Sequence, residues 1–293
     1  MYFPRLYPDE LLYSGIARCR VHLGIGSHKT LLHMLFGDSK VAAITDLPTH
    51  LTALANNTGL DAEGMILNHT LFPLYAPFIP PERRTDLFQA MLAPDRPTIG
   101  LSGASTALVK WPDWLRYCPI CFEDMAARYG EPYWRRSWQI QGIDACPEHG
   151  CQLLNSPIPF RRAQRHEFHT ASPLFLPRDL RVSPVGEEAI RLAKAAMQLL
   201  ALEEVQSPGY GRWTNLYRYL ATECGARRGR QVRAEVIWEK ILASHQRDWF
   251  SGGYPEFFRK KTVEGLDGTH TTLFSDGVYR IIWMLFQHSD GIF

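Results

Sequence analysis

The 293-residue sequence lacks any apolar run long enough to cross a bilayer. Its first ten residues, M-Y-F-P-R-L-Y-P-D-E, also lack the basic and apolar regions of a signal peptide. These absences argue against a membrane protein and against a secreted one. We therefore expect a cytoplasmic protein without a membrane partner.

Neither a strong charge excess nor a disulfide framework is present. The 32 basic and 30 acidic residues give a net charge of only +2, so the overall balance does not require a nucleic-acid partner. Local clusters decide phosphate affinity instead. Six cysteines, four of them in one short stretch, do not make a secreted disulfide scaffold. The other two, Cys19 and Cys224, stand alone in helical patterns and are expected core thiols.

That short stretch contains two tight pairs of metal-binding residue types. Cys118 and Cys121 form a C-x-x-C turn, and Cys146 and His149 form a C-x-x-H turn. A tetrahedral structural zinc needs four such donors, and zinc ribbons deliver them as two pairs. We predict one Zn²⁺ at these four residues, with a strand, a turn and a returning strand between the pairs.

Two alternatives accompany this prediction. Cys151 lies two residues beyond His149 and competes with it as the fourth ligand. The cysteines could instead be buried as reduced, small hydrophobic residues, although that alternative predicts no paired spacing. A catalytic zinc is disfavoured because four strong donors close the coordination sphere, and nothing beyond its position marks Glu148 as a general base.

Helical patterns flank the cysteine stretch on both sides. Before it, we expect helices over 9–23 and 30–36, then two helices turning at Gly59. This last pair resembles a helix-turn-helix, with an ordinary helical hairpin as the alternative. Residues 72–82 are apolar and rich in proline, which predicts an irregular connector.

After the cysteine stretch, helices are expected over 186–202, 213–224 and 232–243. An arginine-rich turn separates the last two of these helices. This arrangement suggests a second helix-turn-helix, or alternatively a run of solvated charges. The hydrophobic fraction of 45% is that of a folded protein. We thus predict a mainly α fold in which helix-turn-helix-like units, 1–108 and 183–293, flank a small zinc-ribbon β module, 109–182.

Basic residues cluster around these predicted units, and such clusters suit a nucleic-acid backbone. Tryptophans interleave with them near the cysteines, and we expect those rings to form a small core around the zinc. The predicted nucleic-acid contacts are Lys29, Lys110, Arg135, Arg136, Arg161, Arg162, Arg165, Arg227, Arg228, Arg230, Arg233, Lys260 and Lys261.

Three segments together resemble the TniQ family of transposon target-selection proteins. They are the opening P-R-L-Y-P-D-E-L-L-Y-S-G-I-A-R, the frame R-Y-C-P-I-C…Y-W-R-R-S-W-Q-I…C-P-E-H-G-C-Q-L-L, and W-T-N-L-Y-R-Y-L. The segment H-T-L-F-P-L-Y-A-P-F is similar to the TnsD branch of that family. The resemblance implies that the zinc ligands of the family correspond to Cys118, Cys121, Cys146 and His149.

The resemblance implies an adaptor without enzymatic activity. Such a protein binds double-stranded target DNA and recruits a TnsC-like AAA+ ATPase, which brings the transposase. The alternative is a protein-interaction adaptor that links a CRISPR surveillance complex to the transposition machinery. A zinc hydrolase is a weaker third possibility because no acid/base pair is visible in the sequence.

Overall fold

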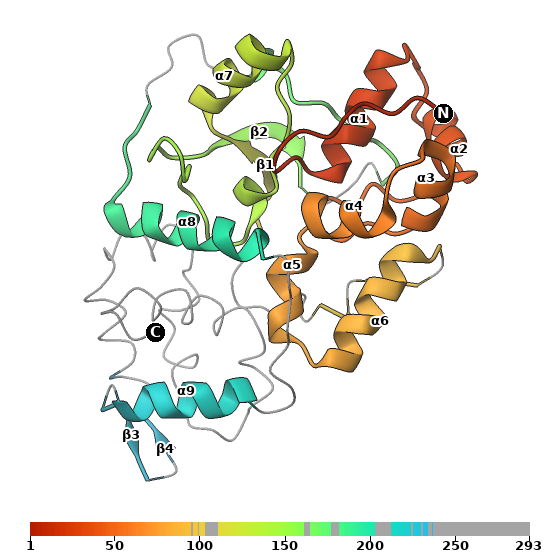
Figure 1. Ribbon diagram of the computed structural model, residues 1–293. Helices are drawn as coiled ribbons and strands as arrows, with labels where there is room; N and C mark the ends of the chain where they lie inside the picture. Colours follow the sequence, from red (N-terminus) through yellow and green to blue (C-terminus); the bar gives the residue numbers. More distant parts are fainter. Residues whose placement is uncertain are drawn as a thin grey trace.

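A computed structural model provides the fold. It describes residues 1–94, 96–98, 100–102, 111–160, 165–176, 182–202, 212–223, 225–229, 231–233 and 236. Helices dominate these residues, together with two small antiparallel sheets of two strands each, so the predicted mainly α class is confirmed (Figure 1). Among the helices of this part of the chain, none combines the length and apolar character that a membrane span requires.

Two predicted helices open the chain. Helix α1 spans Leu12–His22 and helix α2 spans His28–Phe36. The Ser27 side chain caps α2 by accepting a hydrogen bond of 3.3 Å from the backbone N–H of Thr30. A serine in extended backbone conformation is a preferred N-cap, so neighbouring residues in the sequence determine where α2 begins.

The helical pair around Gly59 is also present. Helix α3 spans Leu51–Thr58 and helix α4 spans Ala62–His69. Gly59 has φ of +77°, which only a glycine adopts without strain, and Asp61 caps α4. The apolar faces of both helices are buried, as the pattern predicts. The description of this pair as a helix-turn-helix stays a prediction.

The predicted irregular connector is mostly helical, so that prediction is wrong. Helix α5 spans Phe72–Tyr75, the 3₁₀ helix η1 spans Ala76–Phe78, and helix α6 spans Pro81–Leu92. The prolines lie in the first turns of these short helices. A proline there removes an N–H that has no helical partner in any case, so it favours a helix start instead of preventing a helix.

The cysteine stretch folds differently from the predicted ribbon. Strands β1 (Trp114–Tyr117) and β2 (Leu154–Pro159) pair antiparallel, but both lie outside the two ligand pairs. Between the pairs come helix α7 (Pro119–Tyr129) and the 3₁₀ helix η3 (Ser137–Gln139). The prediction of a strand hairpin between the pairs is therefore wrong. The 3₁₀ helix η4 (Pro173–Phe175) follows β2.

Local signals explain why α7 is a helix. Cys118 is its N-cap and Pro119 its first residue, and Gly130 ends it with φ of +79°. Phe122 and Met125 are buried on one side, while Glu123 is exposed on the other. This pattern has a helical period, which outweighs the expectation drawn from zinc ribbons.

The last described elements are α8 (Glu187–Leu200), α9 (Arg212–Glu223), β3 (Arg227–Arg228) and β4 (Gln231–Val232). Both helices are predicted. The prediction that a helix begins at residue 232 is wrong, because Val232 lies in β4, which pairs with β3 as a hairpin. Gly229, with φ of +62°, allows the tight turn between those strands.

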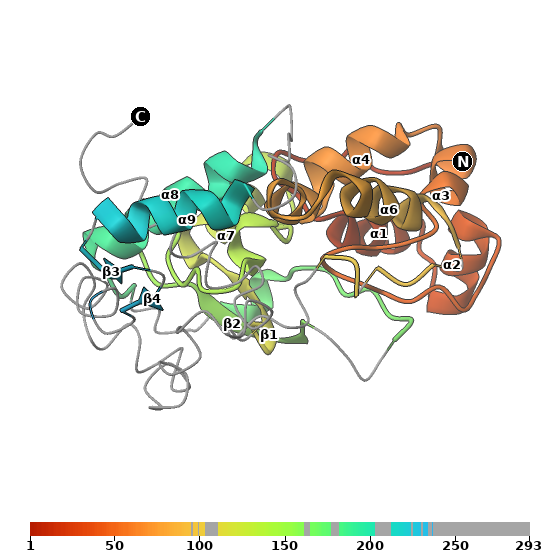
Figure 2. The ribbon, with the colours of Figure 1, turned by 90° about the horizontal axis from the view of Figure 1, so that it is seen from below.

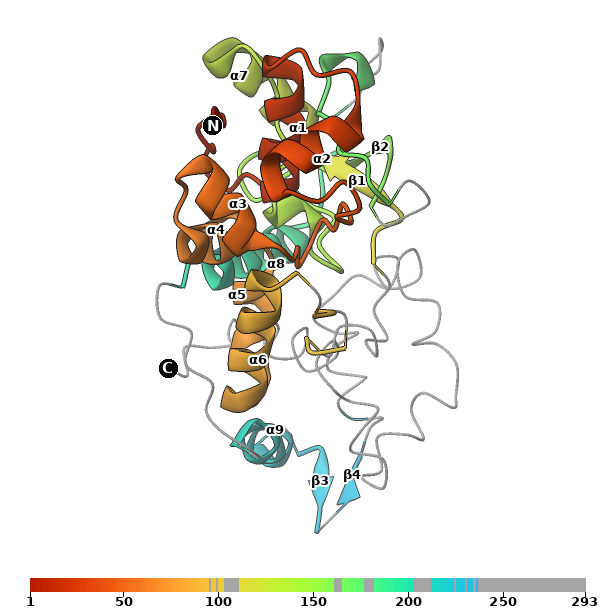
Figure 3. The same ribbon diagram turned by 90° about the vertical axis from the view of Figure 1, so that its right-hand side faces the viewer.

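The elements form two neighbouring groups and one outlying unit. In Figures 1 and 2, helices α1 to α4 and α6 lie to one side of β1, β2, α7 and α8. Helix α9 and its hairpin lie at the opposite end of the molecule from α7, as Figure 3 shows. One hydrophobic cluster runs through the first two groups, from Leu11 to Leu200. The division at residues 108 and 182 stays a prediction, although parts on both sides of each boundary share this core.

Candidate metal centre and basic surface

Two matching turns place the predicted metal ligands. Cys118 follows β1, and its sulfur accepts a hydrogen bond of 3.5 Å from the backbone N–H of Cys121. In the second turn, the sulfur of Cys146 accepts one of 3.5 Å from the backbone N–H of His149. Gly150 then reverses the chain with φ of +58°. Each turn thus aims two donors to the same side.

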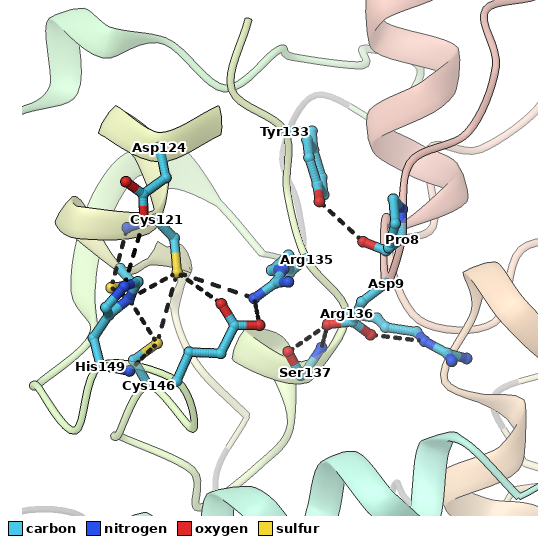
Figure 4. Close-up of polar contacts among 12 residues, drawn as sticks. Pro8, Asp9, Cys121, Asp124, Tyr133, Arg135, Arg136, Ser137, Cys146 and His149 are labelled. Atoms are coloured by element: carbon cyan, nitrogen blue, oxygen red, sulfur yellow. Dashed lines mark hydrogen bonds and ion pairs between the residues drawn. The ribbon is translucent and has the colours of Figure 1, made fainter. Parts of the chain in front are cut away.

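The two turns meet, so the four donors form one cluster (Figure 4). All four ligand atoms lie within 4.8 Å of one another. The Cys121 and Cys146 sulfurs are 3.7 Å apart, and His149 Nδ1 lies 3.2 Å from the Cys121 sulfur and 3.5 Å from the Cys118 sulfur. Tetrahedral zinc with Zn–S bonds of about 2.3 Å separates its sulfurs by about 3.8 Å. The donor set fits a tetrahedral metal ion.

The protonation of the sulfurs leads to the same conclusion. Hydrogen bonds from the Cys118 and Cys121 thiols lower the pKa of Cys146, whereas hydrogen bonds to Cys118 and Cys146, together with burial, raise the pKa of Cys121. Three thiolates this close and this deeply buried repel one another unless a cation lies between them. A bound metal ion would supply that cation, since thiolates are the ligating form of cysteine.

Cys151 lies beside this set. Its sulfur is 3.5 Å from that of Cys118, but the group of mutually close donors contains His149 instead. The backbone carbonyl of Cys151 accepts a hydrogen bond of 2.8 Å from the N–H of Cys146, which holds the two sides of the second turn together. The geometry therefore favours His149 as the fourth ligand.

The comparisons with known proteins agree with the predicted resemblance. A family model described as TniQ matches residues 1–153, slightly more than half of the chain. This chain belongs to the TniQ family. Over 299 aligned residues it is 33% identical to the "Transposon Tn7 transposition protein TnsD" of Escherichia coli. The alignment covers 96% of this chain and 57% of that protein, so the chain spans little more than half the length of this relative.

In this TniQ chain, three polar side chains surround the metal ligands. Asp124 lies on α7 with a carboxylate oxygen 3.5 Å from His149 Nε2, on the ring edge away from the sulfurs. Arg135 forms an ion pair of 2.6 Å with Glu148, and both approach the Cys121 sulfur, at 4.0 and 3.7 Å. Arg135 is only 13% exposed and lies beside the candidate metal ligands, which disfavours its predicted DNA contact.

Arg136, the next residue, is buried. Its guanidinium pairs with Asp9 at 2.9 Å and donates to the carbonyls of Leu67 and Thr70 near the end of α4 and of Leu200 at the end of α8. These contacts use its donors inside the protein. We therefore remove Arg136 from the predicted DNA contacts and assign it to the packing of the TniQ fold.

Two predicted basic segments that are distant in sequence meet near the start of α2. The Phe168 N–H donates a hydrogen bond of 3.2 Å to His28 Nδ1, and the Ala43 N–H donates one of 2.6 Å to the Arg165 carbonyl. Lys29 and Arg165 are both exposed. The fold thus brings the segment of Arg165 to the helix start that carries Lys29.

Two histidines and Arg20 lie at the same place. The His28 and His169 rings are 5.7 Å apart. Burial, followed by the charge of Arg20, lowers the pKa of His28, and burial likewise lowers that of His169. We call these five residues the α2 surface: Arg20, His28, Lys29, Arg165 and His169. Arg20 lies in the last turn of α1, and only its neighbours in space link it to this surface.

The remaining predicted DNA contacts divide into two sets. Arg227 and Arg228 form strand β3, and Arg233 follows β4 as an exposed side chain. These arginines therefore lie on a small hairpin and not in a turn between two helices. The others lie outside the described residues: Lys110, Arg161, Arg162, Arg230, Lys260 and Lys261.

Proposed function

We propose that this chain selects the insertion site of a transposon by binding double-stranded DNA and recruiting a TnsC-like AAA+ ATPase. Membership of the TniQ family and similarity to a protein named for Tn7 transposition support this role. One structural observation carries the DNA part of the proposal. It is the meeting of two basic segments from distant parts of the sequence at the α2 surface.

The α2 surface suits a DNA phosphate for two physical reasons. Lys29 lies in the first turn of α2, where free backbone N–H groups and the helix dipole favour an anion. The segment of the exposed Arg165 is anchored by backbone hydrogen bonds at Ala43 and His28, so this segment is already in place when a phosphate binds. Phosphate contacts of this kind position a protein on DNA, and base contacts or DNA deformation would have to add the sequence preference.

We further propose that the metal is zinc, held by Cys118, Cys121, Cys146 and His149 as a structural ion. Three thiolates and one imidazole form a donor set typical of structural zinc, and a bound ion of this kind supplies folding free energy. Four protein donors leave no open position for a substrate. The proposed role is therefore that of an adaptor without catalysis.

A mobility-shift assay tests the DNA proposal. Wild-type protein is titrated against DNA that carries the attachment site and against scrambled DNA, at several salt concentrations. Lys29→Ala and Arg165→Ala should each weaken binding to both DNAs and reduce the slope of log K against log salt by about 1. Lys194→Ala, which removes an exposed lysine from α8, is the matched control.

The outcomes separate the two candidate functions. Tighter binding to the attachment-site DNA, lost or weakened in the α2 variants but kept in Lys194→Ala, supports target selection. Equal affinity for both DNAs at every salt concentration contradicts sequence-specific selection. Co-purification with a CRISPR surveillance complex, without binding to free DNA, favours the alternative adaptor.

A further inference from the structure

The proposed zinc centre carries one uncompensated negative charge. A divalent cation with three thiolates and a neutral imidazole has one negative charge in excess. The three cysteines are at most 3% exposed, so water screens that charge poorly. A buried charge of this kind needs a partner close by.

Arg135 is placed to be that partner. Its guanidinium Nη1 lies 4.0 Å from the Cys121 sulfur, and Figure 4 shows the side chain reaching from the Arg135 backbone toward the cluster. The backbone at Arg135 is fixed by a β-bridge to Glu10 and by a hydrogen bond of 3.1 Å from the Gln139 side chain to its carbonyl. The guanidinium also lies 5.6 Å from the centre of the Trp138 ring.

Glu148 makes this position electrostatically sensitive. Its carboxylate is 2.6 Å from Arg135 and 3.7 Å from the Cys121 sulfur. With Arg135 present, the carboxylate orients the guanidinium beside the sulfur. Without Arg135, the same carboxylate would add a second negative charge next to the thiolates.

We propose that Arg135 is a positioning residue of the zinc centre, whose charge offsets the excess negative charge of the centre and shields its thiolates from Glu148. The inference rests on the zinc centre proposed above. It assigns Arg135 a role in metal retention in place of the DNA contact that its sequence suggests. The role belongs to the guanidinium charge and not to its volume.

The test measures how fast zinc leaves the full chain in an excess of a colorimetric chelator. Wild type should release one zinc per chain slowly, and Arg135→Met should release it on the order of 10-fold faster. Arg135→Lys keeps the charge and should restore most of the retention. Arg128→Met, which removes an exposed arginine from α7, should behave as wild type.

A second pair of variants separates charge from packing. Glu148→Gln alone should retain zinc, because Arg135 stays beside the sulfur. The double variant Arg135→Met with Glu148→Gln should release zinc more slowly than Arg135→Met alone. If the double variant releases zinc as fast as the single one, Arg135 acts through packing and the inference is wrong. The inference is also wrong if wild type holds zinc stably and Arg135→Met releases it at the same rate as wild type. Wild-type protein that contains no zinc would instead overturn the zinc proposal itself.

Discussion

At the scale of single residues, Arg18 and Glu10 show how sensitive a buried charge is to its partner. Both side chains are almost fully buried, with 2.8 Å between Arg18 Nη1 and Glu10 Oε2. Arg18 also pairs with Glu131 at 2.8 Å and lies 4.0 Å from the centre of the Tyr7 ring. Burial raises the pKa of Glu10 although Arg18 opposes the shift, so desolvation outweighs the attraction.

We predict that Arg18→Met lowers the free energy of unfolding by about 3–5 kcal/mol, because it leaves Glu10 charged or protonated without its partner. Urea denaturation at pH 7 measures the loss. Glu10→Gln added to Arg18→Met should recover part of it, since the unpaired buried charge is then absent. Arg128→Met, at an exposed position, should change stability by less than about 0.5 kcal/mol. If Arg18→Met and Arg128→Met lowered the free energy of unfolding by similar amounts, the assigned role of the Arg18–Glu10 pair would be contradicted.

At the scale of elements, short polar caps set where the helices begin. Asp61 accepts hydrogen bonds from the backbone N–H groups of Glu63, at 3.2 Å, and Gly64, at 2.8 Å. These are two of the four N–H groups that have no partner within α4. The carboxylate also interacts favourably with the positive end of the helix dipole.

Asp61→Ala should therefore destabilise the protein by about 1 kcal/mol. Glu63→Ala is the matched control, because it removes the same charge from the same turn but not the cap. Thermal unfolding of both variants at one pH checks the difference. Equal melting temperatures for the two would show that charge near the helix start matters and the cap does not.

The elements that were predicted correctly have strong local signals. Ser27 and Gly59 mark helix ends that the structure keeps, and the buried faces of α3 and α4 follow the sequence period. The predictions that are wrong concern segments whose sequence pattern is compatible with two different structures. The prolines of 72–82 start helices where the pattern predicts an irregular connector, and the cysteine spacing predicts a ribbon hairpin although Pro119 and Gly130 frame a helix.

At the scale of the whole molecule, the metal centre and the helical units share one core. Arg136 links Asp9 with the ends of α4 and α8, and its neighbour Arg135 lies beside the metal ligands. Trp134 and Trp138 are fully buried against Phe122 of α7, as expected for the tryptophans, whereas Trp114 is 41% exposed. Loss of the metal should therefore affect more than the local turns.

We predict that Cys118→Ser removes zinc and weakens DNA and ATPase binding together, since structural zinc supplies folding free energy. In wild type, zinc release and the loss of helical circular dichroism should have the same urea midpoint. Cys19→Ser, at a buried cysteine outside the cluster, should keep the zinc. A Cys118→Ser protein with wild-type helix content and both binding activities would contradict this organising role.

The sequence by itself determined the helical class, the two ligand pairs and the TniQ family, because caps, periodicity and short spacings act within a few residues. Only the tertiary structure decided which basic residues face solvent. It buried Arg136, paired Arg135 with Glu148, and brought the segment that carries Arg165 to the start of α2. The physical reason is that burial and pairing of a charge depend on neighbours far away in the chain, which spacing does not encode.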